Sequence, residues 1–100
     1  LQELGRLQEA EESYRQAIAS KPDYTEAHNN LGVTLQELGI LDEAEASSTQ
    51  AIALKPDFAE AHSNLGQILF KKGQHREGLK EMLKGDGAIT FSLKSGLSIL

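Results

Sequence analysis

The chain has 100 residues, of which 39% are hydrophobic and 25% charged, and its formal net charge is −5. This composition is typical of one small folded domain, because a chain of this length buries too little surface to supply a second core. The sequence contains no cysteine, which excludes disulfides, thiolate metal sites and cysteine nucleophiles.

Charge and hydropathy vary along the chain in a way that excludes some partners. Residues 1–61 hold 12 acidic and 4 basic side chains, whereas residues 62–100 hold 6 basic and 3 acidic ones. We expect no nucleic-acid partner, because the first part repels phosphate and the second is too sparsely basic to bind it. The longest apolar run, Ala51 to Leu54, is far shorter than the roughly 20 residues that span a membrane.

The lack of cysteine fits a reducing compartment, so we expect a cytoplasmic protein. Since the first residue is Leu1 rather than Met, we also expect a piece of a longer polypeptide.

The sequence repeats itself at an offset of 34 residues. Residues 1–24 match residues 35–58 at 17 of 24 positions, and a third copy begins at Ala59. A repeat of this length predicts an array of similar helical units, each of which packs on its neighbours.

Apolar spacing and turn residues predict the helices in chain order. In the first copy Gly5 closes the remnant of a first helix, and a second helix follows near residues 8–20. Pro22 ends that helix. The next helix begins near Tyr24 and is closed by Gly39, because glycine adopts the left-handed conformation that ends many helices. Further helices are predicted near residues 42–54, from about Phe58 to Gly73, and near residues 75–84.

Each Lys-Pro turn is followed by a signal for the start of a helix. Asp23 precedes Glu26 by three residues, and Asp57 precedes Glu60 in the same way. This spacing predicts an N-cap aspartate whose carboxylate accepts hydrogen bonds from the first amides of the helix.

Small residues recur where paired helices would touch. Gly32 lies on the first helix of a pair and Ala44 and Ala51 on the second, with Ala10 and Ala17 at the equivalent positions of the first copy. Small side chains allow two helix axes to approach to about 8–10 Å.

Three positions depart from this pattern. Ser48 stands where the other copies have Tyr14 and Met82, so we expect a gap that costs on the order of 1 to 3 kcal/mol compared with Tyr. Gly78 and Gly85 replace the two helix alanines in the last copy. We therefore expect the array to fray at its C-terminal end, because glycine destabilises a helix by up to about 1 kcal/mol relative to alanine.

After Lys84 the sequence period changes. Ile89, Phe91 and Leu93 alternate with polar residues, which predicts a short extended or hairpin tail. A lone hairpin is marginal in water. Residues 85–100 are therefore expected to cap the array or, as we favour, to begin a following domain that is truncated.

The repeated positions resemble the signature of the tetratricopeptide repeat (TPR): Leu31-Gly32, Leu35, Gly39, Ala44, Ala51 and Pro56. The resemblance implies an all-α, right-handed solenoid of antiparallel helix pairs over residues 1–84. It divides this array into a partial repeat (1–24), a repeat (25–58) and a divergent repeat (59–84), about two and a half repeats in all. The residues are most similar to those in the superhelix of O-linked N-acetylglucosamine transferase and of similar bacterial proteins.

No group of residues indicates catalysis or a bound cofactor. His28 and His62 are equivalent in successive repeats, and one interpretation is a metal site. The other is that they fill the position between helices where many members of the family carry Trp. No third ligand recurs with them, so we predict no metal. The hydroxyls of Ser47, Ser48 and Thr49 lack nucleophile-elbow glycines and a base at a defined spacing, so we predict no enzyme.

The inner face of the array is the candidate binding surface. The resemblance implies that the first helix of each pair lines the concave side, and that Asn30 and Asn64 belong to a ladder of asparagines that holds a peptide backbone. An amide side chain offers a donor and an acceptor, which match the N–H and C=O of an extended chain. The alternative is that these asparagines only cap or solvate the helices. The candidate peptide-binding residues are Asn29, Asn30, Val33, Gln36, Glu37, Glu60, Ser63, Asn64, Gln67, Phe70 and Lys71.

Acidic side chains on this face restrict the partner. Repeats of the family that clamp the C-terminal carboxylate of chaperones use Lys and Arg here, whereas this chain has Glu26 and Glu60. These would repel a carboxylate. We expect the partner to be a protein or peptide that is neutral or basic.

The main functional hypothesis is a non-catalytic scaffold that binds an extended segment in the concave groove. The alternative is a substrate-recruiting arm of a larger enzyme, such as a glycosyltransferase, whose catalytic domain lies beyond Leu100. A third possibility is self-association through uncapped ends, which expose apolar faces that further repeats normally cover.

Overall fold

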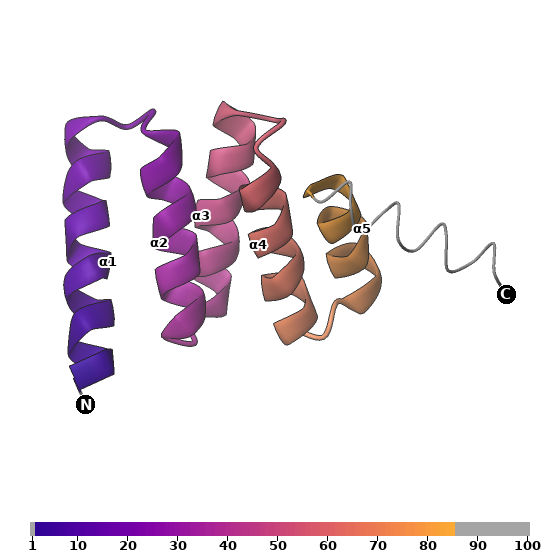
Figure 1. Ribbon diagram of the computed structural model, residues 1–100, viewed down its shortest axis with the longest axis horizontal. Helices are drawn as coiled ribbons and strands as arrows, with labels where there is room; N and C mark the ends of the chain where they lie inside the picture. Colours follow the sequence, from indigo (N-terminus) through magenta and orange to yellow (C-terminus); the bar gives the residue numbers. More distant parts are fainter. Residues whose placement is uncertain (1, 86–100) are drawn as a thin grey trace, which may run out of the picture.

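The computed structural model describes residues 2–85, and within this range it contains five α-helices and no strand. The helices follow one another in chain order along the long axis, and consecutive helices run in opposite directions (Figure 1). The predicted all-α helical solenoid is therefore confirmed. The helices are α1 (Gln2–Ser20), α2 (Thr25–Glu37), α3 (Leu41–Leu54), α4 (Ala59–Lys71) and α5 (His75–Gly85).

The expected C-terminal tail lies almost wholly beyond the helical array. The expected extended or hairpin tail lies outside the described residues, apart from Gly85, which is the last residue of α5.

None of the described helices is both long and apolar enough to cross a bilayer.

Glycines end α2 and α4, as the sequence predicts. Gly39 has a φ of 81° and Gly73 a φ of 85°, in the region that glycine enters without steric cost. The amide of Ile40 donates to the carbonyl of Leu35 (2.9 Å), and the amide of Gly39 donates to the carbonyl of Gln36 (3.0 Å). These bonds form a Schellman motif, which satisfies carbonyls that the helix end leaves free. The same pattern follows α4 at Gly73.

The prediction that Gly5 ends a helix is wrong, because α1 runs through it without a break. Gly5 does not have a positive φ, and a Cβ added to it would meet nothing within 4 Å. At Gly39 and Gly73 the chain turns so that the next helix packs on the preceding one. No described helix precedes α1, so no packing favours a turn at Gly5, and helical hydrogen bonding continues.

The aspartate caps predicted before α2 and α4 are also wrong. The N-cap residues are Tyr24 and Phe58, and neither side chain makes a capping hydrogen bond. Asp23 lies in a tight turn, in which the amide of Tyr24 donates to the carbonyl of Lys21 (3.0 Å), and the equivalent bond precedes α4. Pro22 suits the second position of such a turn. The turn therefore sets the start of α2, and the capping box does not form.

The buried core lies between the middle helices. Its apolar centre consists of Leu31 and Leu35 from α2, Ala44 from α3 and Ile68 from α4. No single helix could cover these side chains, so the helices are stable only when they pack together in the array. Three partly exposed residues pack against this centre: Tyr14, Ile18 and Leu41.

Small residues bring the paired helices into contact, as predicted. A Cβ on Gly32 would lie 2.6 Å from Ser48 Oγ, and a Cβ on Gly66 would lie 2.6 Å from the carbonyl oxygen of Gly78. Both glycines therefore allow a backbone approach that alanine would obstruct. Ser48 is fully buried against Gly32, and its hydroxyl has no hydrogen-bond partner among the described residues. The sequence did not predict this unpaired hydroxyl, and the gap expected at Ser48 stays a prediction.

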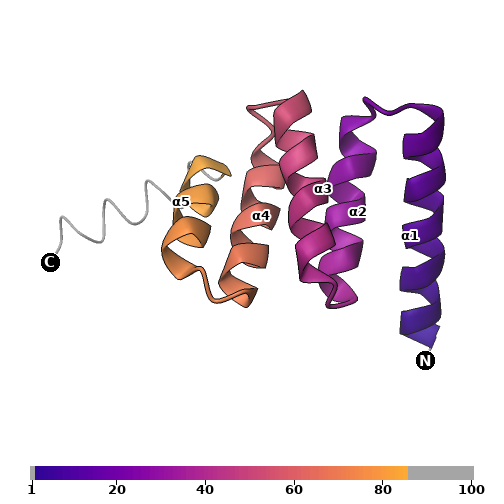
Figure 2. The same ribbon diagram turned by 180° about the vertical axis from the view of Figure 1, so that it is seen from behind.

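The backbones of α2 and α4 also approach each other, whereas those of α1 and α3, and of α3 and α5, do not. In Figure 1, α3 lies behind α2 and α4, and in the reverse view of Figure 2 it lies in front. The helices therefore form two rows, and α2 and α4 belong to the more closely spaced one. In a curved stack, the closely spaced row is the inner one.

Candidate functional site

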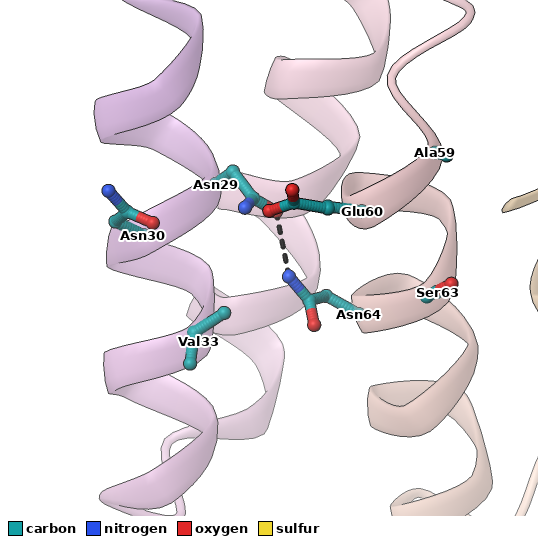
Figure 3. Close-up of a pocket in the computed structure, with 7 residues that line it drawn as sticks. All are labelled: Asn29, Asn30, Val33, Ala59, Glu60, Ser63 and Asn64. Carbon is teal, nitrogen blue, oxygen red and sulfur yellow. Dashed lines mark hydrogen bonds between the residues drawn. The ribbon is translucent and has the colours of Figure 1, made fainter.

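An open hollow of about 340 Å³ lies between α2 and α4. It is on the row that the sequence predicts to be the inner face, and α2 and α4 contribute all of its lining (Figure 3). Six of the seven lining residues are candidate peptide-binding residues, and Ala59 is the addition. The lining consists of Asn29, Asn30, Val33, Ala59, Glu60, Ser63 and Asn64.

A hydrogen bond between two asparagines crosses this hollow from one helix to the other. Asn64 Nδ2 donates to Asn29 Oδ1 at 2.8 Å, shown as the dashed line in Figure 3. Asn29 lines the hollow but is only 2% exposed, so little of its side chain is accessible to a peptide. A buried amide needs such a partner. Asn29 therefore joins successive repeats, and Asn64 keeps its carbonyl oxygen for other contacts.

Asn30 has a different environment from its repeat equivalent, Asn64. Its side chain is exposed and lies on the side of α2 away from Asn64 in Figure 3, at the edge of the hollow that it lines. The two asparagines do not bond to each other. They border the same hollow as separate polar groups.

Glu60 gives the hollow its charge. It is the only ionisable residue in the lining, and its side chain is exposed and has no hydrogen bond or ion pair with the described residues. Val33 adds a half-buried apolar wall. The hollow thus combines a carboxylate, amides, a hydroxyl and one aliphatic surface.

The structure does not bring the remaining predicted residues into the hollow. Gln36 is 8% exposed, and its Nε2 donates to Gln67 Oε1 at 3.4 Å, so Gln36 belongs to the packing between α2 and α4. The ring of Phe70 stacks on that of His75, with centroids 5.1 Å apart. Phe70 therefore packs toward α5 and does not line the hollow. Glu37, Gln67 and Lys71 are exposed but do not line the hollow.

The repeated histidines bind backbone carbonyls. A carbonyl oxygen only accepts, so the ring N–H of His28 Nε2 donates to the carbonyl of Pro22 (2.8 Å). His62 Nε2 makes the equivalent bond to Pro56 (2.7 Å), and its Nδ1 lies 3.1 Å from Glu81 Oε2. Within residues 2–85, no group of three or more His, Asp or Glu side chains is placed to hold a metal ion. Each histidine ties its helix to the preceding turn, a role that the shared offset of the His and Pro residues could have indicated.

Ion pairs away from the hollow engage two of the cations. Lys72 Nζ lies 2.8 Å from Asp42 Oδ1 and 2.6 Å from Glu45 Oε1. The hydrogen bond from Lys72 lowers the pKa of Asp42, and the same contact raises the pKa of Lys72. On the other side of α3, Arg15 pairs with Glu43 at 2.8 Å. These cations link neighbouring helices and do not neutralise Glu60.

Comparison with known proteins agrees with this architecture. The model of the TPR repeat family matches residues 1–39 and 41–73. A crystal structure of MamA is 27% identical, has a TM-score of 0.76, and the match covers 89% of this chain and 52% of that one. A second crystal structure of MamA is 29% identical with a TM-score of 0.73, and this match covers 79% of this chain and 43% of the MamA chain. This chain spans about half the length of those MamA chains.

A third similar structure has a bound peptide. It is described as the second TPR of Spaghetti (RPAP3) bound to the HSP90 peptide SRMEEVD, and it is 23% identical with a TM-score of 0.78. The match covers 81% of this chain and 75% of that one. At this identity the likeness shows the fold alone. The sequence has no match among curated proteins.

Proposed function

This chain belongs to the tetratricopeptide repeat family, and we propose that it is a non-catalytic protein-interaction module that holds an extended segment of a partner between α2 and α4. The hollow between these helices carries the proposal. It is an open surface of polar side chains with one aliphatic wall, built on two packed helices and not on mobile loops.

The hydrogen-bonding groups of the hollow suit an extended backbone. The amide of Asn30 offers both donors and an acceptor, and Asn64 retains its Oδ1 beside the bond to Asn29. An extended segment presents alternating N–H and C=O groups that such amides can bind without requiring a particular side chain. The Spaghetti structure supports the proposal only in showing that this fold can hold a peptide.

Selection from a displayed library of random ten-residue peptides, with the full chain as target, tests the proposal. The double substitution Asn30→Ala with Asn64→Ala is expected to weaken the best selected peptide about tenfold, since each net hydrogen bond contributes roughly 0.5 to 1.5 kcal/mol. Fluorescence anisotropy measures the dissociation constants.

Two controls separate recognition from scaffold damage. Asn29→Ala breaks the same 2.8 Å interhelical bond but removes a residue that is 2% exposed, and it is expected to cost less affinity than the double substitution. Gln50→Ala, on the outer helix α3, is expected to leave affinity unchanged. If no peptide is enriched, or if Asn29→Ala alone reproduces the whole loss, the proposed binding mode is wrong.

A further inference from the structure

The charge of the hollow is set by one residue. Glu60 is the only ionisable side chain that lines it, and no described residue neutralises this carboxylate. Lys72 pairs with Asp42 and Glu45 on α3, and Arg15 pairs with Glu11 and Glu43. Among residues 2–85, no cation pairs with this carboxylate, which can therefore accept a cation from a bound segment.

Two other features of the hollow affect its polarity in opposite directions. The Asn64 amide directs one N–H to Asn29 Oδ1, which leaves its carbonyl oxygen as a second acceptor in the hollow, on the side of the amide away from Glu60 in Figure 3. The N-terminus of α4 contributes a positive partial charge of about half an elementary charge. This is smaller than the full charge of Glu60, so the hollow stays negative.

We propose that the hollow selects a segment carrying a lysine or arginine, whose cationic group pairs with Glu60 while the adjoining backbone lies along α2 and α4. This inference rests on the proposed function and names the chemistry of its partner. The ammonium or guanidinium group is a donor without acceptors, which complements the Glu60 carboxylate and Asn64 Oδ1. The aliphatic stem of either side chain can lie on Val33.

The size of the effect follows from the exposure of Glu60. An exposed ion pair contributes less than a buried one, because water screens it. Glu60 therefore acts as a specificity residue: it discriminates between charges by a few fold, and the amides and the apolar wall supply the rest of the affinity. The same carboxylate repels a segment that places an acidic side chain in the hollow.

The experiment repeats the library selection on the unmodified chain, on Glu60→Gln and on Glu60→Lys. Glu26→Gln is the matched control, because Glu26 is the repeat equivalent in the first turn of α2, is exposed, and does not line the hollow. Peptides selected by the unmodified chain and by Glu26→Gln are expected to be enriched in Lys and Arg. The enrichment is expected to vanish with Glu60→Gln and to change to Asp and Glu with Glu60→Lys.

Binding constants make the comparison quantitative. The best selected peptide, with its basic residue present or replaced by Gln, is titrated against the chain and each variant. The basic form is expected to bind about threefold to fivefold more tightly to the unmodified chain, and equally to Glu60→Gln. The preference is expected to shrink as salt is raised.

The outcomes separate this inference from the proposed function. Enriched peptides without a basic bias, or a basic bias that Glu60→Gln retains, would overturn the inference and leave peptide binding standing. Failure to enrich any peptide would overturn both. Circular dichroism of each variant checks that its helices are intact.

Discussion

Ser48 shows how much depends on a single side chain at a helix contact. It is fully buried between α2 and α3, directly against Gly32, and its Oγ lacks a hydrogen-bond partner among the described residues. Burial removes the hydroxyl from water. A buried polar group that gains no hydrogen-bond partner lowers the free energy of unfolding by about 1 to 3 kcal/mol. The size of the side chain suits the close approach of the helices, but its polarity does not.

Ser48→Ala is therefore expected to raise the free energy of unfolding by about 1 to 2 kcal/mol, because it removes the unpaired hydroxyl and improves helix propensity. Urea denaturation followed by circular dichroism measures this change. Ser13→Ala is the control, since Ser13 is exposed within α1 and gains only the propensity. If the two substitutions stabilise the chain equally, Ser48 has no desolvation cost.

At the scale of the element, one five-residue sequence occurs twice, and its final glycine lies in a different environment each time. Leu-Gln-Glu-Leu-Gly occurs at 1–5 and again at 35–39, yet Gly5 lies inside α1 while Gly39 follows the end of α2. The second copy turns because α3 packs on α2 through Gly32 and Ala44. The first copy has no described helix on which to turn back, so local sequence leaves the choice to tertiary packing.

Substitution of these two glycines by alanine is expected to have opposite effects. Gly5→Ala is expected to stabilise the chain by about 0.5 to 1 kcal/mol, because alanine is the better helix former and its Cβ meets no neighbour within 4 Å. Gly39→Ala is expected to destabilise it by about 1 to 2 kcal/mol, because φ is 81° there. Thermal or urea unfolding decides the signs. A loss of stability in Gly5→Ala would show that Gly5 ends a helix after all.

At the scale of the whole molecule, stability is unevenly distributed along the array. Each helix packs mainly on its sequence neighbours, as in other solenoids, and the apolar centre belongs to α2, α3 and α4. Ala10 and Ala17 of α1 are half-buried, whereas their equivalents Ala44 and Ala51 in α3 are fully buried. None of the described side chains of α1 is fully buried.

We therefore expect α1 to open before α2, α3 and α4. Native-state amide hydrogen exchange should give the lowest opening free energies in α1, with the highest in α2 and α4. The Schellman amides of Ile40 and Gln74 are internal references, because they bond to the ends of those inner helices. Equal protection in α1 and α2 would instead mean that the chain unfolds as one cooperative unit.

Part of the site could be predicted from the sequence. The repeat period and the small residues fixed which helices pair, and six candidate residues do line the hollow. The positions of Asn29 and Phe70 could not be predicted. Adjacent helical residues such as Asn29 and Asn30 point about 100° apart, so a small rotation of α2 decides which amide is buried. Phe70 packs toward α5 because Gly78, which has no side chain, leaves room for the ring. This contact depends on how α4 and α5 pack together.

The sequence by itself determined the 34-residue repeat, the helical class and the glycine turns after α2 and α4. All of these depend on residue type at fixed local spacing. Only the tertiary structure decided that α1 continues through Gly5, that Asn29 bonds to Asn64, and that no residue among 2–85 pairs with Glu60. These depend on the distance and rotation between helices, which are set by packing of side chains far apart in the chain.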